Sequence, residues 1–186
     1  MVFRTSRRRV GIRLFALLAM LTTTTAVALA AAAPAQASAT AMQRCLSGAA
    51  PNETQTVTHY GNQAASSFPN AVDPPNAIWP GDVVKVTAIG SITNAPWPFG
   101  GWFGPAGNSI PAGPEFPFPG LNEYSSVARW NAQGSGWVGD PMHTVSLSAC
   151  VYAPSIRVRL IYQINDNVLW DNGGAFTITT KLYYGP

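Results

Sequence analysis

The chain has few of the residues on which most catalytic sites are built. It contains only two histidines, His59 and His143, and no Gly-x-Ser-x-Gly elbow. Asp140 lies close to His143, but the Asp140-Pro141 pair is also typical of a turn. Eight acidic residues are present, and nothing in their spacing selects the two carboxylates that glycoside hydrolysis requires. We therefore expect no enzyme activity, and a secreted hydrolase is the least favoured alternative.

Cysteine is also scarce, since Cys45 and Cys150 are the only two in the sequence. A metal site built on cysteine needs further ligands of that kind, which the chain lacks. In an oxidising compartment, an isolated pair is most simply a disulfide. A Cys45–Cys150 bridge would close a loop of about 100 residues and stabilise the fold by about 2–4 kcal/mol. We expect it to tie a flexible N-terminal segment to a late strand.

Acidic residues are absent before Glu53, whereas five arginines crowd the first 13 positions. An apolar run over residues 14–20 follows, and then small residues that end in an Ala-x-Ala site. This order is typical of a signal peptide, with cleavage after Ala37 or Ala39. A membrane anchor is disfavoured because the apolar run is much shorter than the roughly 20 residues that span a bilayer. We expect residues 1–39 to be removed and the protein to be secreted.

Loss of that segment would reverse the net charge. The whole chain carries 11 basic and eight acidic residues, which gives a net charge of +3. Five basic residues lie in the predicted signal, so six remain against eight acidic ones and the net charge becomes −2. No basic stripe is left for nucleic-acid binding, and we expect no membrane contact after cleavage. Residues 40–186 are long enough for one domain with its own core.

Long helical patterns are missing, and alternation of apolar and polar residues dominates the chain after the signal. The alternation is clearest over residues 155–164 and 175–183, and weaker over 81–89, 124–130 and 143–152. Strict alternation places successive side chains on opposite faces of a sheet, so each stretch predicts a half-buried strand. Clusters of Gly, Pro and Asn separate these stretches. The pattern predicts an all-β fold, a small antiparallel β-sandwich of the jelly-roll kind.

Two connecting segments carry the residue types of a binding site. Residues 94–120 are dense in Pro and Gly yet hold several aromatic residues, among them Trp97 and Trp102. Exposed tryptophan rings can stack on the apolar faces of sugars, but such rings can also fold back as a lid over a sheet. Residues 165–174 are rich in Asp, Asn and Gly. Their oxygens suit calcium, although the same residue types also satisfy the geometry of a hairpin turn.

Four short motifs span most of the predicted domain. They are Gly81-Asp82-Val83-Val84, Trp102-Phe103-Gly104-Pro105-Ala106-Gly107, Leu160-Ile161-Tyr162 and Asp171-Asn172-Gly173-Gly174-Ala175-Phe176. Together they resemble the LecA-type galactose-binding lectins, which are small calcium-dependent bacterial β-sandwiches. The resemblance covers about residues 81–183 and includes the ungapped spacing from Ile161 to Phe176. It implies a galactose-binding-like β-sandwich with a lectin function.

The resemblance also implies a set of calcium ligands. Where the lectins hold a calcium-ligating Asp, this chain has Ile164. Asp166 follows two residues later and can replace the lost carboxylate only if the loop is rearranged. Because ligand charge tunes calcium affinity over orders of magnitude, this departure bears directly on metal binding. The other expected ligands are the backbone carbonyls of Asn94 and Val168 and the side chains of Asp171 and Asn172.

By the same resemblance, a sugar would lie between residues 94–107 and 165–172, with its hydroxyls completing the calcium shell. Asn108 opens the segment in which the lectins hold a His and a Gln, and neither of these has a clear match here. The expected sugar contacts are Trp97, Trp102, Asn108, Asp171 and Asn172.

We therefore expect a secreted, non-enzymatic domain that binds carbohydrate, either a galactose-type sugar or a cell-surface glycan, with calcium as its cofactor. Family lectins assemble to gain avidity, so a homo-oligomer is compatible with this interpretation. The alternative is a secreted structural or interaction protein that keeps the lectin-like scaffold without a sugar site. Ile164 and the missing His favour this alternative.

Overall fold

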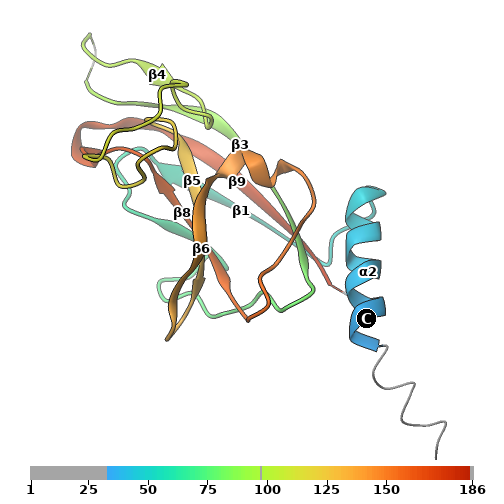
Figure 1. The fold of residues 1–186 in the computed structure, drawn as a ribbon. Coiled ribbons are helices and arrows are strands. Elements are labelled where there is room, and N and C mark those ends of the chain that lie inside the picture. The colour runs from blue at the N-terminus through green and yellow to red at the C-terminus, as the bar shows by residue number, and fades with distance from the viewer. Residues whose placement is uncertain (1–32, 97, 185–186) are drawn as a thin grey trace, which may run out of the picture. The chain divides into compact units, whose positions relative to one another are not determined.

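The computed structural model describes residues 33–96 and 98–184, whose strands form two antiparallel sheets (Figure 1). Residues 1–32, which hold most of the predicted signal peptide, lie outside the described part. The arrangement confirms the predicted all-β class and the antiparallel sandwich. The first sheet has the order β1 (Glu53–Tyr60), β9 (Gly173–Tyr183), β3 (Val83–Thr93) and β4 (Trp102–Phe103), and β7 (Val151–Tyr152) also pairs with β3. The second sheet has the order β2 (Ser66–Phe68), β8 (Arg159–Ile164), β5 (Ser126–Ala132) and β6 (Gly136–His143).

The sequence predicts β8 and β9 best because one face of each strand is buried in the core. Along β9, Phe176, Ile178 and Leu182 are buried, and they belong to the same core cluster as Leu160 of the second sheet. Thr180 is buried on the same face, and Thr177, Thr179 and Lys181, which alternate with these residues, are partly exposed, as strict alternation requires. β8 begins only at Arg159, later than the predicted residue 155, because residues 155–157 are exposed and the buried Val158 forms only an isolated bridge with Ile78.

The predicted strand over residues 143–152 is wrong in its centre. β6 ends at His143, the 3₁₀ helix η1 (Thr144–Ser148) follows, and only two residues then return to a sheet as β7. Thr144 and Leu147 are the buried residues of η1. They stand three positions apart, which is the spacing that places side chains on one side of a 3₁₀ helix. The sequence interpretation took this spacing for alternation.

A helix stands where a flexible segment was predicted. α2 (Ala33–Leu46) includes both expected cleavage positions. Alanine, glutamine, methionine and arginine, which all favour helix, are frequent in it. Ala41 and Cys45 pack in a small buried cluster with Val83 and Tyr183 of the first sheet, and two buried positions are too few for a helical period to stand out in the sequence. Among the described residues, no helix has the length and apolar character needed to cross a membrane.

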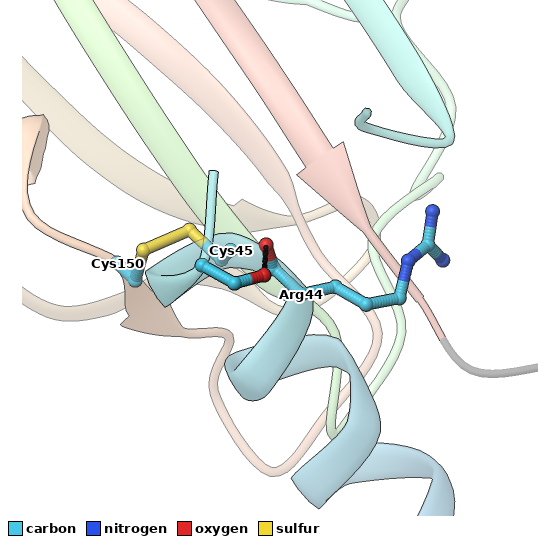
Figure 2. The surroundings of a disulfide bond; sticks show 4 residues. Arg44, Cys45 and Cys150 are labelled. Carbon is cyan, nitrogen blue, oxygen red and sulfur yellow. Dashed lines mark hydrogen bonds between the residues drawn. A yellow bond between two sulfur atoms is a disulfide. The ribbon is translucent and has the colours of Figure 1, made fainter. Parts of the chain in front are cut away.

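The predicted disulfide is confirmed. Cys45, near the end of α2, is bonded to Cys150, which directly precedes β7 (Figure 2). The Arg44 side chain leaves the helix on the other side, and its guanidinium donates hydrogen bonds to Asn52 Oδ1 and to the carbonyl oxygen of Tyr184. The end of α2 is thus fixed to the segments beside β7, β1 and β9. A disulfide of this kind fits a protein that is exported to an oxidising compartment.

Replacing both cysteines tests the stabilising effect of this cross-link. In the Cys45→Ser/Cys150→Ser variant we expect the free energy of unfolding to fall by about 2–4 kcal/mol, because the unfolded chain regains the entropy of a long closed loop. Urea unfolding measures this change. Dithiothreitol should destabilise the wild type by a similar amount and leave the double variant unaffected. Equal unfolding midpoints for wild type and variant would contradict the prediction.

His59 joins the edges of the two sheets. It lies on β1, an edge strand of the first sheet, and its Nδ1 is 2.8 Å from the hydroxyl of Ser66 on β2, an edge strand of the second. The side chain is fully buried, and its Nε2 has no hydrogen-bond partner among the described residues. Burial lowers the pKa of His59 to about 4, because the charged imidazolium would lose its hydration. The folded protein therefore holds this histidine in its neutral form.

Burial of His59 makes the stability depend on pH. The unfolded chain binds the proton near pH 6.5 and the folded chain only near pH 4, so the stabilisation is complete above pH 6.5 and is lost as the pH falls toward 4. We expect the free energy of unfolding to drop by up to about 3 kcal/mol over this range. Urea titrations at successive pH values measure it. In His59→Asn the profile should flatten between pH 6.5 and 5, and an unchanged profile would disprove the assignment.

Candidate functional site

Two segments that are far apart in the sequence close around a cavity of about 290 Å³. Thr93 ends the ladder between β3 and β9, where it pairs with Gly173, and it also pairs with Trp102 of β4. In Figure 1, β4 and the loop that leads into β9 lie at the same end of the sandwich. This is where the sequence predicts the site. The cavity is lined by Thr93, Ala95, Pro96, Gly100 and Trp102 on one side and by Asp171, Asn172 and Gly173 on the other.

Trp102 forms an exposed wall of this cavity. The residue is 64% exposed, and its ring lies beside Gly174, where an added Cβ would come within 3.1 Å of the Trp102 Cζ3 atom. The same Cβ would lie 2.3 Å from the carbonyl oxygen of Ser91. Gly174 also has a φ of +73°, which only glycine adopts without strain. The glycine therefore leaves the space in which the Trp102 ring sits.

The aromatic residues of the 94–120 segment divide between the two roles that the sequence leaves open. Phe116 and Phe118 are buried, and Phe118 lies against the guanidinium of Arg129 on β5. These residues cover the second sheet as a lid does. Trp102 instead lies on the surface, as a stacking platform must. Trp97, the other predicted sugar contact, lies outside the described residues.

Asp166 and Asn172 are linked to each other beside the cavity. The buried Asp166 accepts hydrogen bonds from the Val168 amide and from Asn172 Nδ2, each 2.9 Å long. Asn172 Nδ2 also donates to the Gly61 carbonyl, so the orientation of its amide is fixed. Burial raises the pKa of Asp166 against the effect of these hydrogen bonds, and the negative charge of Asp171 adds to the rise. Two carboxylates and an amide therefore lie within electrostatic reach of one another.

Two oxygens on residues that line the cavity have no partner. Asp171 Oδ1 and Asn172 Oδ1 are both buried, and neither has a hydrogen bond within the described protein. A buried acceptor without a donor costs about 1–3 kcal/mol, and more when it is charged. Native folds leave few such groups, and each calls for an explanation such as a bound ion. Each of these oxygens is therefore a position at which a donor or a cation would bind favourably.

The donor set around these oxygens is that of a hard cation. Calcium prefers six to eight carboxylate, amide and carbonyl oxygens, and Asp171 and Asn172 supply the first two types. Among residues 33–96 and 98–184, no three His, Cys, Asp or Glu side chains gather into a metal-binding group. A cation here would therefore depend on amide and carbonyl oxygens in addition to Asp171. The residues fit calcium in chemical type.

The remaining predicted ligands do not line the cavity. Ile164 is buried in the core, and both oxygens of Asp166 already accept hydrogen bonds. Asp166 thus supports Asn172 and does not take the position of the carboxylate that Ile164 replaces. The side-chain oxygen of Asn94 accepts a hydrogen bond from the Gly101 amide, so it shapes the first loop. Asn94 lies between two lining residues, Val168 lies three positions before Asp171, and neither lines the cavity.

Asn108 is not brought to the cavity. Its Nδ2 donates to Glu123 Oε2 at 2.7 Å, and its Oδ1 accepts from the Ile110 amide at 2.9 Å. Both polar atoms of the side chain are therefore used within the long loop. The role of Asn108 as a sugar contact stays a prediction, since its side chain stabilises its own loop and the residue is not among those that line the cavity.

Asn165 anchors a loop near the site, and the sequence analysis did not assign it this role. Its side chain is completely buried, and its Oδ1 accepts from the Phe118 amide at 3.0 Å. Its Nδ2 donates to the carbonyl oxygens of Phe118, Leu121 and Asn122. This one amide therefore ties the 118–122 segment to the end of β8. In the sequence, Asn165 is only one of several Asn and Asp residues in a turn. That pattern does not show whether its side chain binds the protein backbone or a metal ion.

His143 anchors the same segment from the other side. Its Nε2 accepts a hydrogen bond from the Asn122 amide at 3.0 Å. The nearby Ser146 hydroxyl donates to the His143 carbonyl and not to its ring. The imidazole thus holds a backbone amide, which is a structural arrangement and not that of a base beside a nucleophile.

No protein-family model matches the chain, and no curated protein matches it in sequence. A functional conclusion must therefore come from the site itself. The observations that bear on it are the cavity between the two loops, the exposed Trp102 ring and the two unpartnered oxygens of Asp171 and Asn172.

The anchoring role of Asn165 can be tested by truncation. In Asn165→Ala we expect the free energy of unfolding to fall by about 3 kcal/mol, because buried backbone groups of the 118–122 segment lose their partners. Urea unfolding measures the loss, and limited proteolysis should show faster cleavage within residues 104–122. Asn167→Ala is the matched control, since Asn167 is exposed and its removal should change stability by less than about 0.5 kcal/mol. Similar stabilities for the two variants would refute the role.

Proposed function

We propose that this protein is a secreted, non-enzymatic carbohydrate-binding domain, similar to the LecA-type lectins, that holds a neutral sugar in the cavity beside Trp102. The observation that carries the proposal is that Asp171 and Asn172, two residues that line this cavity, each keep a buried oxygen without a partner among the described residues. A concave site with one aromatic wall and a few convergent polar groups is typical of small-ligand binding.

Calcium is the cofactor that would satisfy both oxygens at once. Asp171 would contribute a carboxylate and Asn172 an amide oxygen, and the orientation of the Asn172 amide is already fixed by Asp166 and Gly61. The carboxylates of Asp171 and Asp166 lie close enough to raise the pKa of Asp166, so the site carries negative charge that a divalent cation would offset. A bound calcium ion would offer its open coordination positions to neighbouring sugar hydroxyls.

Trp102 supplies the apolar half of the recognition. Sugars present C–H groups on one face of the ring, and an exposed indole offers a rigid apolar surface at little entropic cost. Because Trp102 is packed beside Gly174 and still 64% exposed, its ring is both positioned and accessible. The cavity would then bind the sugar hydroxyls on the Asp171 side and contact the apolar face of the sugar on the Trp102 side.

A second candidate function is a secreted structural or interaction protein that keeps this scaffold without a sugar site. One observation favours it: the position of a lectin calcium ligand is held by Ile164, which is buried in the core. Asp166 does not line the cavity in its stead. In that case the unpartnered oxygens would be hydrated, and neither calcium nor sugar would change the stability of the protein.

Removal of the Asp171 carboxylate separates these two candidates. For the wild type we expect calcium to raise the stability by about 2.7 kcal/mol at a hundredfold excess over its dissociation constant, and galactose to bind only in calcium. In Asp171→Ala the calcium effect and the galactose binding should both disappear while the sandwich remains folded. Thermal unfolding in calcium and in chelator measures the first effect, and titration calorimetry with galactose measures the second.

Asp140→Ala is the matched control, because Asp140 is an exposed acidic residue on β6 outside the lining of the cavity. It should behave as the wild type in both measurements. If Asp171→Ala kept its calcium response, the proposed position of the site would be wrong. If the wild type showed no response to calcium or galactose, the scaffold function would replace the proposed one.

A further inference from the structure

A second cleft, of about 670 Å³, adjoins the loop that carries Asp171 and Asn172. Trp170 lies on its border and is 83% exposed, more than any other tryptophan in the described part of the chain. The ring borders a concave surface that asparagine residues also line, a combination found in small-ligand sites. The cleft is lined by, among others, Asn62, Glu115, Phe116, Asn167, Leu169 and Trp170.

The second cleft adjoins the Trp102 cavity through one hydrogen-bonded pair of residues. Asp166 lines the cleft, and its carboxylate accepts the 2.9 Å hydrogen bond from Asn172, which lines the cavity. Trp170 immediately precedes Asp171 in the 3₁₀ helix η2 (Leu169–Asp171). Residues that are adjacent along the chain therefore line the two openings. A ligand that extends out of the cavity over η2 would reach the Trp170 ring.

The chemistry of the cleft suits a neutral polar ring with an apolar face. Phe116, Leu169 and Trp170 give it an apolar floor, and the amides of Asn62 and Asn167 stand beside them. Among the residues that the structure describes, no Lys or Arg lines either opening, whereas carboxylates line both. Anionic ligands would therefore be repelled. A neutral sugar, which combines C–H faces with hydroxyl groups, matches both the apolar floor and the amides.

We infer that this cleft is a subsite for the second sugar residue of a neutral oligosaccharide whose terminal sugar occupies the Trp102 cavity. The inference rests on the proposed function and adds that the ligand is a glycan of at least two residues and not a free monosaccharide. Trp170 stacks on the second sugar, and Asn62 and Asn167 meet its hydroxyls. Trp170 is thus a residue that determines specificity for chain length and linkage.

Titration calorimetry in calcium tests the subsite, with galactose compared against neutral galactose-terminated disaccharides of several linkages. We expect at least one disaccharide to bind tenfold or more tightly than galactose. In Trp170→Ala this gain should vanish while the affinity for galactose itself stays unchanged. Trp79→Ala is the matched control, because Trp79 is also exposed but stacks on Arg157 and belongs to neither lining. It should keep the full gain.

The outcomes distinguish this inference from the proposed function. If galactose binds but no disaccharide binds more tightly, or if Trp170→Ala keeps the gain, the subsite is disproved and the Trp102 cavity stands. If the wild type binds neither galactose nor any disaccharide, the proposed function and the subsite fall together. A disaccharide that binds without calcium and is lost only in Trp170→Ala would support the subsite and overturn the calcium site. Urea unfolding of each variant confirms that it is folded.

Discussion

The ladder between β3 and β9 is the interaction on which the rest of the structure depends. It pairs Val83–Thr93 with Gly173–Tyr183 along their whole length, and β1 and β4 add to its two sides. A shift of this register by one residue would turn the buried face of β9 toward solvent, and Phe176 and Ile178 would leave the core. The same shift would separate Thr93 from Gly173, the pair at which the two loops meet. The core and the candidate site are therefore set by a single register.

The buried polar groups at this end of the sandwich fall into two sets, those with hydrogen-bond partners and those without. The amide of Asn165 is completely engaged and holds the 118–122 segment in place. A few residues later, Asp171 and Asn172 each keep a buried oxygen without a partner. Buried polar groups with partners help to specify one structure. A buried group without a partner destabilises the fold, and a ligand that supplies the missing partner removes this cost. The first set builds the loops, and the second set is where binding is to be expected.

The strands could be predicted where burial on one face imposes alternation, as in β9 with Phe176 and Ile178. The 3₁₀ helix η1 and the helix α2 could not, because η1 buries only two side chains and α2, over residues 40–46, buries only Ala41 and Cys45. In the site, the lectin-like motifs predicted that Asp171 and Asn172 meet the segment of Trp102, since both lie at the end of one strand ladder. The roles of Asn165 and Asp166 could not be assigned. Whether an Asx side chain binds its own backbone or a ligand depends on loop shape, which is set by residues distant in sequence.

The central claim is that the unpartnered oxygens beside Trp102 hold a cation that organises ligand binding. The most direct measurement is a crystal structure of the protein grown in calcium chloride, with anomalous scattering used to identify the ion. The account predicts one calcium ion within about 2.3–2.6 Å of Asp171 Oδ1 and Asn172 Oδ1. Water molecules in place of an ion at both oxygens, in a crystal saturated with calcium, would contradict it.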